Sequence, residues 1–150
     1  MGVFMEIPMY VTVEEVQRVC RLLNISDWTT KGDATVLIEE AHIILSEVNT
    51  EGMNLYVESF RRGLEVELEH GVRFKDANVT NNHPLLTGKI VLAHLKETMD
   101  YYERLEVAEL EGDLLKATVA RHPAKVESLY RKLLAAKLDL AKVESEKLNS

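Results

Sequence analysis

The chain has 150 residues, of which 46% are hydrophobic and 29% charged, and its formal net charge is −7. This length suits one domain with a sizeable core and is too short for two ordinary domains. The acidic balance disfavours nucleic-acid backbones, which are bound by clustered Lys and Arg. No apolar run approaches the roughly 20 residues that span a bilayer. We therefore expect a cytoplasmic chain, without a secretory signal in residues 1–8, that binds neither nucleic acid directly nor a membrane.

The N-terminal part predicts an extended arm followed by a short helix. Residues 5–11 are apolar and partly β-branched, but Pro8 and the lack of a second strand leave them no sheet to join. Thr12 begins a capping box, which predicts a helix over 13–23. Cys20, the single cysteine, follows the apolar spacing of this helix and is expected to be a core residue.

Helical spacing resumes twice in the middle of the chain. After a loop anchored by Trp28, Asp33 is expected to cap a second helix. The apolar spacing of that helix comprises Leu37, Ile38, Ala41, Ile44, Leu45 and Val48. A further helix is predicted over 55–69, and Gly71 offers a left-handed helix end. Residues 71–86 are rich in Asn, Asp and Thr, which predicts an ordered polar loop.

The C-terminal half predicts two long helices. Apolar spacing continues from residue 85 to 119, and His122-Pro123 ends it because proline disfavours helical geometry in the residue before it. The last segment has a heptad pattern of apolar residues, with steps of three and four. This first line comprises Val126, Leu129, Leu133, Ala136, Leu140 and Val143, with Lys147 at the next position. A second line comprises Tyr130, Leu134, Leu138 and Ala141. Two lines allow the helix to contact two neighbours.

Together these segments predict an all-α fold, a compact helical bundle of about five helices in one domain covering 1–150. Residues 1–11 form the extended arm, 12–119 the core helices and 124–148 a long amphipathic C-terminal helix. That helix is a candidate oligomerisation element. The alternative is that it only closes its own bundle.

Three Glu/His pairs at helical spacing are the main candidates for chemistry. The pairs are Glu39 with His42, Glu67 with His70, and His94 with Glu97. A spacing of three places both side chains on one helix face, where they can share a metal ion, as in bundle di-iron and di-manganese sites. Glu67, His70, His94 and Glu97 are the predicted ligands, for iron, manganese or zinc. The alternative is a buried polar network of the same four residues that fixes helix register.

Several short motifs carry a family resemblance. They are Glu67-Leu68-Glu69-His70-Gly71, Asn78-Val79-Thr80-Asn81, Pro84-Leu85-Leu86-Thr87-Gly88-Lys89-Ile90, Ala93-His94-Leu95 and Asp100-Tyr101-Tyr102-Glu103-Arg104-Leu105. Together they resemble a family of small uncharacterised bacterial, archaeal and phage proteins, a domain of unknown function. The resemblance implies that the His70 helix end, the polar loop and the His94 helix form one helical hairpin, which would gather the four predicted ligands. It implies no activity.

No enzyme class is favoured by the remaining residues. Thr87-Gly88-Lys89 lacks the first glycine of a Walker loop, and no Gly-x-Ser-x-Gly turn is present. Two hypotheses follow. We favour a non-catalytic module that self-associates, or binds a protein partner, through its C-terminal helix. The alternative is a metal-binding helical-bundle protein of ferritin-like type that uses the Glu/His pairs.

Overall fold

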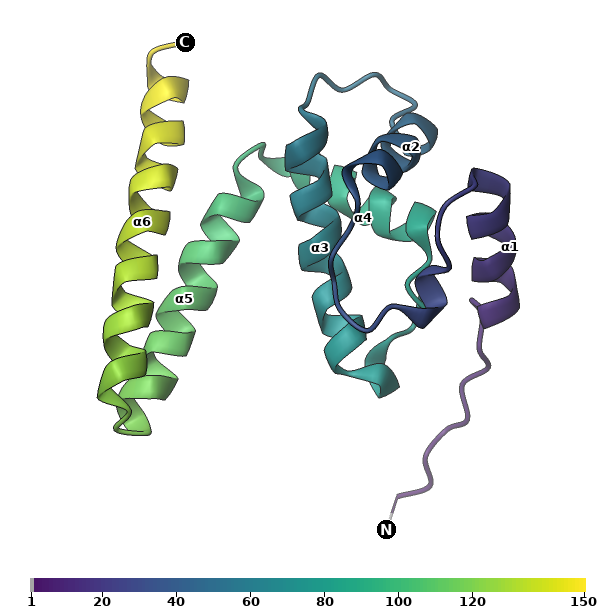
Figure 1. The fold of residues 1–150 in the computed structure, drawn as a ribbon, viewed down its shortest axis with the longest axis horizontal. Helices are drawn as coiled ribbons and strands as arrows, with labels where there is room; N and C mark the ends of the chain where they lie inside the picture. The colour runs from purple at the N-terminus through teal and green to yellow at the C-terminus, as the bar shows by residue number, and fades with distance from the viewer. Residues whose placement is uncertain (1) are drawn as a thin grey trace. The chain divides into compact units, whose positions relative to one another are not determined.

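A computed structural model, which describes residues 2–150, contains six α-helices and two short 3-10 helices (Figure 1). They are α1 (Val13–Leu23), η1 (Trp28–Thr30), α2 (Ile38–Val48), α3 (Val57–Arg73), η2 (Lys75–Ala77), α4 (Pro84–Glu97), α5 (Tyr101–Val119) and α6 (Pro123–Leu148). Residues 2–150 contain no strand, so the predicted all-α fold class is confirmed. Contacts divide the chain into two compact units, Met1–Ala93 and His94–Ser150. The single domain expected from the sequence stays a prediction.

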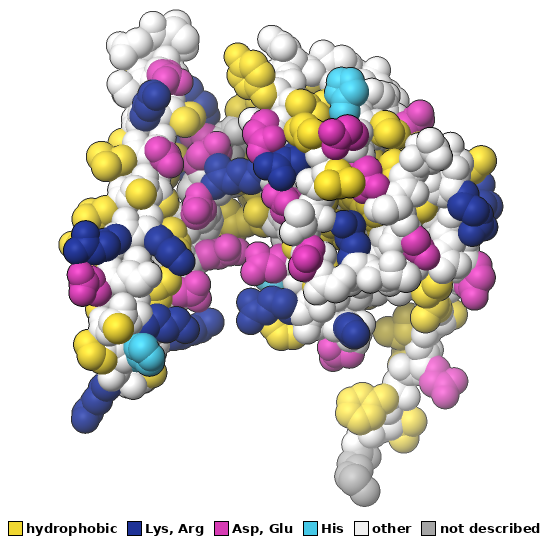
Figure 2. All heavy atoms as spheres, in the orientation of Figure 1, with side chains coloured by type: hydrophobic (Ala, Val, Ile, Leu, Met, Phe, Trp, Pro, Cys, Tyr) yellow, Lys and Arg dark blue, Asp and Glu magenta, His cyan; other side chains and the backbone are white. Residues whose placement is uncertain are grey.

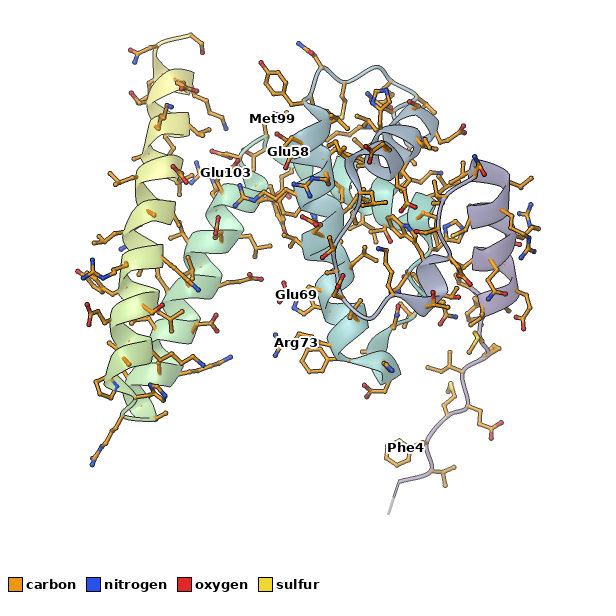
Figure 3. All side chains as sticks on the ribbon, viewed as in Figure 1. Phe4, Glu58, Glu69, Arg73, Met99 and Glu103 are labelled. Atoms are coloured by element: carbon orange, nitrogen blue, oxygen red, sulfur yellow. The ribbon has the colours of Figure 1, made fainter. Side chains whose placement is uncertain are left out.

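The arm and α1 follow the sequence pattern closely. Residues 2–10 form neither helix nor strand and are exposed, and Figure 3 shows Phe4 on this arm, extending away from the helices. The amide of Asn81 donates to the Val11 carbonyl at 2.6 Å and ties down the end of the arm. Thr12 caps α1 by accepting from the Glu15 N–H at 3.1 Å, as its position predicts.

The second helix begins later than predicted. Asp33 does not cap it, because its carboxylate accepts from the Thr35 N–H at 2.9 Å within a local turn. The Val36 N–H then donates to the Glu65 carboxylate of α3 at 3.0 Å, which holds this stretch outside the helix. The helix α2 therefore starts at Ile38.

The third helix ends later than predicted, because Gly71 lies within α3 rather than terminating it. A Cβ atom at position 71 would lie 2.9 Å from the side chain of Asn78, which is closer than two such atoms approach. Glycine is therefore needed here for the close approach of the following loop. It is not needed for a left-handed turn.

The predicted continuous helix over 85–119 is two helices, α4 and α5, separated by Thr98, Met99 and Asp100. Figure 3 shows Met99 in this link. The Thr98 hydroxyl donates to the Asp100 carboxylate, and the Tyr101 N–H donates to the Thr98 carbonyl at 3.2 Å. Such short-range bonds of Thr and Asp compete with helical ones, which explains the break.

The unit Met1–Ala93 has its core between α2, α3 and the first part of α4. Trp28, Ile44, Phe60 and Leu64 are fully buried there. A Cβ atom at Gly88 of α4 would lie 2.9 Å from Ile44 Cγ2 and 3.3 Å from Phe60 Cζ. The absence of a side chain at Gly88 thus lets α4 pack closely on both α2 and α3.

The unit His94–Ser150 is built on a hairpin of α5 and α6 (Figure 1). Arg121, with φ 55°, forms the turn, and Pro123 is the first residue of α6, one position before the predicted start at residue 124. Three residues of the predicted heptad line, Leu129, Leu133 and Ala136, are buried against α5. None of the helices in residues 2–150 has both the length and the apolar character required to span a membrane.

Candidate functional site

The four predicted metal ligands lie on two helices, Glu67 and His70 on α3 and His94 and Glu97 in the last turn of α4. His70 and Glu97 are exposed, whereas Glu67 and His94 are half-buried. Among residues 2–150, no group of three or more His, Cys, Asp and Glu side chains is arranged to hold a metal ion. The metal-binding alternative is therefore not favoured, and the four-ligand set stays a prediction.

His94 takes part in a small aromatic cluster. Its ring stacks on that of Tyr101, with centroids 4.0 Å apart, and its Nδ1 lies 3.2 Å from the hydroxyl of the buried Tyr102. A hydrogen bond at one ring nitrogen fixes the orientation of an imidazole. The cluster gives His94 a structural role in joining the end of α4 to the first turn of α5.

The surroundings of His70 are those of a solvated helix end. Its ring stacks on Phe74, with centroids 6.5 Å apart. The adjacent Glu69 and Arg73, labelled in Figure 3, form an exposed ion pair at 3.9 Å. Exposed pairs of this kind contribute about 0–1 kcal/mol, so this pair adds surface charge more than stability.

The polar loop between α3 and α4 is ordered by its own side chains, as predicted. Asn78 donates to the Asn82 side-chain oxygen at 2.9 Å, and Asn82 in turn donates to the Trp28 carbonyl at 2.9 Å. Asn81 and Asn82 adopt left-handed backbone conformations, with φ of 48° and 61°. Asparagine tolerates this conformation better than most residues, which accounts for its repeated use here.

Two hollows adjoin this loop. One, of about 200 Å³, is lined by Glu67, His70 and loop residues, and the other, of about 380 Å³, by residues that include Lys31 and Lys75. Within the part of the chain that is described, every fully buried side-chain nitrogen and oxygen has a hydrogen-bond partner. Residues 2–150 therefore contain no fully buried side-chain polar atom that needs a ligand as its partner, and we assign a ligand to neither hollow.

Two histidines act as helix caps, a role that the sequence analysis missed. The Nδ1 atom of His83 accepts from the N–H groups of Leu85 and Leu86 at 3.2 and 3.3 Å. Burial lowers the pKa of His83 below its usual value, which favours the neutral ring that can accept. His122 repeats the arrangement and accepts from the Lys125 N–H at 3.2 Å. The shared signal is a histidine directly before a proline at the helix start.

The tripeptide Thr87-Gly88-Lys89 lies inside α4 and not at its start, since this helix begins at Pro84. The Thr87 hydroxyl donates to the His83 carbonyl at 2.7 Å and is buried, whereas Lys89 is exposed. The residues serve helix packing and surface charge, in agreement with the interpretation that they form no Walker loop.

Glu40 is a buried acid whose role was not predicted from the sequence. Its carboxylate accepts from the Ser26 N–H at 2.7 Å and from the Trp28 indole N–H at 2.9 Å. Burial raises the pKa of Glu40, but the hydrogen bonds from Ser26 and Trp28 outweigh it and hold that pKa below its usual value. Glu40 thereby fixes the loop before α2 and the Trp28 side chain.

The cysteine is a core residue, as predicted. Cys20 is 2% exposed, and burial raises the pKa of its thiol. Reactive cysteines have lowered pKa values and exposed sulfur atoms, so Cys20 has the character of a packing residue.

A buried carboxylate holds the far end of α6 on α5. Asp100 accepts from Arg104 at 2.9 Å and from Lys147 at 3.1 Å, and Arg104 also pairs with Glu144 at 3.2 Å. Burial raises the pKa of Asp100, but bonds from Thr98, Arg104 and Lys147 hold that pKa well below its usual range. This group, the Asp100 clamp, fixes the register of α6 against the start of α5.

The two apolar lines of α6 have different surroundings. The members of the first line are buried or half-buried in the hairpin, apart from the terminal Lys147. The second line is exposed: Tyr130 is 54%, Leu134 49% and Leu138 71% exposed. In Figure 2, hydrophobic side chains lie exposed along this hairpin among Lys and Arg. The second line is therefore a large apolar surface without a partner in the hairpin itself.

A groove runs beside the start of the second line. It has a volume of about 740 Å³ and is lined by the α5–α6 turn and the first three turns of α6, including Val126, Tyr130 and Leu134. Thr118 of α5 also lines it. Contiguous exposed apolar surface of this kind is typical of protein-interaction sites.

A comparison with protein families gives a match over more than half of the chain. The family described as "Protein of unknown function (DUF5661)" matches residues 16–111, which covers α1 to the middle of α5. Neither a curated protein nor a solved structure matches the chain.

Proposed function

The chain belongs to the DUF5661 family, whose function is unknown, and we propose that it is a non-catalytic module that self-associates through the C-terminal helical hairpin. The contact surface is the second apolar line of α6, with Tyr130, Leu134, Leu138 and Ala141. One observation carries the proposal: α6 has two apolar lines, and the hairpin covers only the first.

The energetic case rests on the size of these side chains. Tyr130, Leu134 and Leu138 are each about half exposed or more. Complete burial of a Leu-sized side chain contributes about 1.5–3 kcal/mol, and burial of the remaining half contributes a share of that. A two-fold interface counts each residue twice, so these residues supply several kcal/mol toward association.

The charge distribution supports a second copy as the partner. Residues 101–150 contain nine basic and nine acidic side chains, so they are neutral, whereas residues 1–100 carry the whole net charge of −7. Like-charge repulsion between two copies is therefore weakest where the hairpins approach each other.

The proposal is tested by sedimentation analysis of the full-length chain with a Leu134→Glu variant. The variant places two carboxylates in one dimer interface, where they remove apolar burial and repel each other. We expect the dissociation constant to rise by at least about 100-fold, since each 1.4 kcal/mol of lost binding free energy raises it tenfold. Ala135→Glu is the matched control, since Ala135 is exposed, adjacent and outside the line. A dimer that survives Leu134→Glu, or a wild-type chain that stays monomeric at high concentration, contradicts the proposal.

A further inference from the structure

We infer that two copies pair through α6 in antiparallel orientation, with a two-fold axis that crosses the helix near residue 136. The inference rests on the self-association proposed above and specifies its geometry. It follows from three features of the hairpin: the position of the second line on α6, the sizes of its side chains, and the distribution of charge between the two ends.

The second line lies in the middle of its helix. It extends from Tyr130 to Ala141, and α6 extends from Pro123 to Leu148, so the two ranges share one midpoint. A two-fold axis through this midpoint superposes line on line while the helices overlap along their whole length. An isologous dimer closes in this way without leaving part of the apolar line exposed.

The side-chain sizes fit an antiparallel pair. With the axis near residue 136, Tyr130 of one copy faces Ala141 of the other, and Leu134 faces Leu138. Large residues then meet small ones at both ends, and residues of equal size meet in the centre, as close packing requires. A parallel pair would place Tyr130 against Tyr130 and Ala141 against Ala141, which overfills one end and leaves a gap at the other.

The charges of the hairpin give the same orientation. Residues 112–135, the half at the turn, contain five basic and two acidic side chains, a net charge of +3. Residues 101–111 and 136–148, the open half, contain four basic and seven acidic side chains, a net charge of −3. An antiparallel pair places each positive half beside the partner's negative half, whereas a parallel pair places like charges together.

Cross-linking of full-length cysteine variants with a short bismaleimide tests the orientation. Glu127→Cys and Ser145→Cys place thiols near the line, at positions that face each other across the predicted axis. Cys20 is buried and does not compete. Lys132→Cys and Asp139→Cys form the matched control, since both are exposed, have the same midpoint and point away from the line at 100° per residue.

We expect cross-linked dimers when the Glu127→Cys and Ser145→Cys proteins are mixed, and none from either alone or from the control pair. Dimers from Glu127→Cys alone would show a parallel pair and overturn the inference while leaving self-association intact. Sedimentation as a dimer without any cross-link would overturn it in the same way. A wild-type chain that sediments as a monomer would overturn the proposed function itself.

Discussion

The Asp100 clamp makes a specific prediction about the stability of the hairpin. Asp100→Asn keeps the shape of the side chain but removes the charge that Arg104 and Lys147 contact at 2.9 and 3.1 Å. A hydrogen bond to a charged group contributes about 1.5–3 kcal/mol, and both cationic partners are half exposed, so solvent screens part of that. We expect the unfolding free energy of the α5–α6 hairpin to fall by about 2 kcal/mol.

The matched control for this variant is Glu127→Gln. It removes an ion pair with Arg131 that has the same 2.9 Å distance, but whose side chains are 70% and 77% exposed. Exposed pairs contribute about 0.2–1 kcal/mol, so the control should change stability by roughly 0.5 kcal/mol or less. The comparison therefore contrasts a buried carboxylate that contacts Arg104 and Lys147 with an exposed carboxylate that contacts Arg131 at the same shortest distance.

Urea unfolding followed by far-UV circular dichroism measures the free energy of unfolding of the two variants. Amide hydrogen exchange along α5 and α6 shows where stability is lost. Faster exchange confined to these helices in Asp100→Asn agrees with the clamp. Equal, small effects in the two variants would refute the reasoning that burial makes this carboxylate important.

The clamp also predicts an acid dependence. The folded-state pKa of Asp100 is lowered, so its contribution is present above the unfolded-state pKa of about 3.9 and is lost as the pH falls toward the folded-state value. The difference between the wild type and Asp100→Asn should therefore be constant near neutrality and shrink below about pH 4. A difference that stays constant into this acid range would contradict the lowered pKa.

Two further variants test the packing and capping of α4. Gly88→Ala gains about 1 kcal/mol of helix propensity, but its Cβ would lie 2.9 Å from Ile44 Cγ2, and overpacking costs about 1–3 kcal/mol, so thermal unfolding should show a net loss. Gly112→Ala, with no atom within 4 Å of its Cβ, should instead stabilise the chain, and the same sign for both would contradict the packing argument. His83→Ala should cost about 1 kcal/mol at pH 8 through the lost cap. Since the folded-state pKa of His83 is lowered, the wild-type advantage over His83→Ala should decline as the pH falls below about 6.5, and an advantage that grows there would contradict the capping role.

The elements predicted correctly have strong local signals. The Thr12 cap gives α1 with its observed bounds, although the Glu15 carboxylate binds Arg18 and does not complete the capping box. The heptad of α6 gives the last helix and its buried side, and Pro123 marks where that helix begins. In both cases the residues that decide the structure are within a few positions of each other, so no tertiary contact is needed to read them.

The errors share a different cause. Asp33, Gly71 and Thr98 each follow rules for helix ends or helix interiors, and each is overruled by a contact that the linear pattern does not contain. The Thr35 N–H donates to the Asp33 carboxylate, and the close approach of Asn78 leaves no room for a side chain at position 71. At Thr98 the local bond to Asp100 is strengthened by Lys147, which is 49 residues away from Thr98. The Asp33 bond spans only two residues, but apolar periodicity does not report side-chain hydrogen bonds, and it cannot identify partners such as Asn78 or Lys147 either.

The histidines also show how spacing along the chain differs from structural role. His94 was singled out by its spacing from Glu97, but its orientation follows from Tyr101 and Tyr102. His83 and His122 were not singled out, although each caps a helix. A histidine before a proline was the available signal. By contrast, the second apolar line of α6 could be recognised in the sequence, but only the structure shows that its side chains are exposed.

Sedimentation of the full-length chain over a range of concentrations, with and without Leu134→Glu, measures whether the exposed line of α6 holds two copies together. We expect the wild type to have twice the mass of one chain and Leu134→Glu the mass of one chain, while the Ala135→Glu control remains a dimer. A wild-type chain that stays monomeric at the highest concentration, or a dimer unaffected by Leu134→Glu, would contradict this expectation.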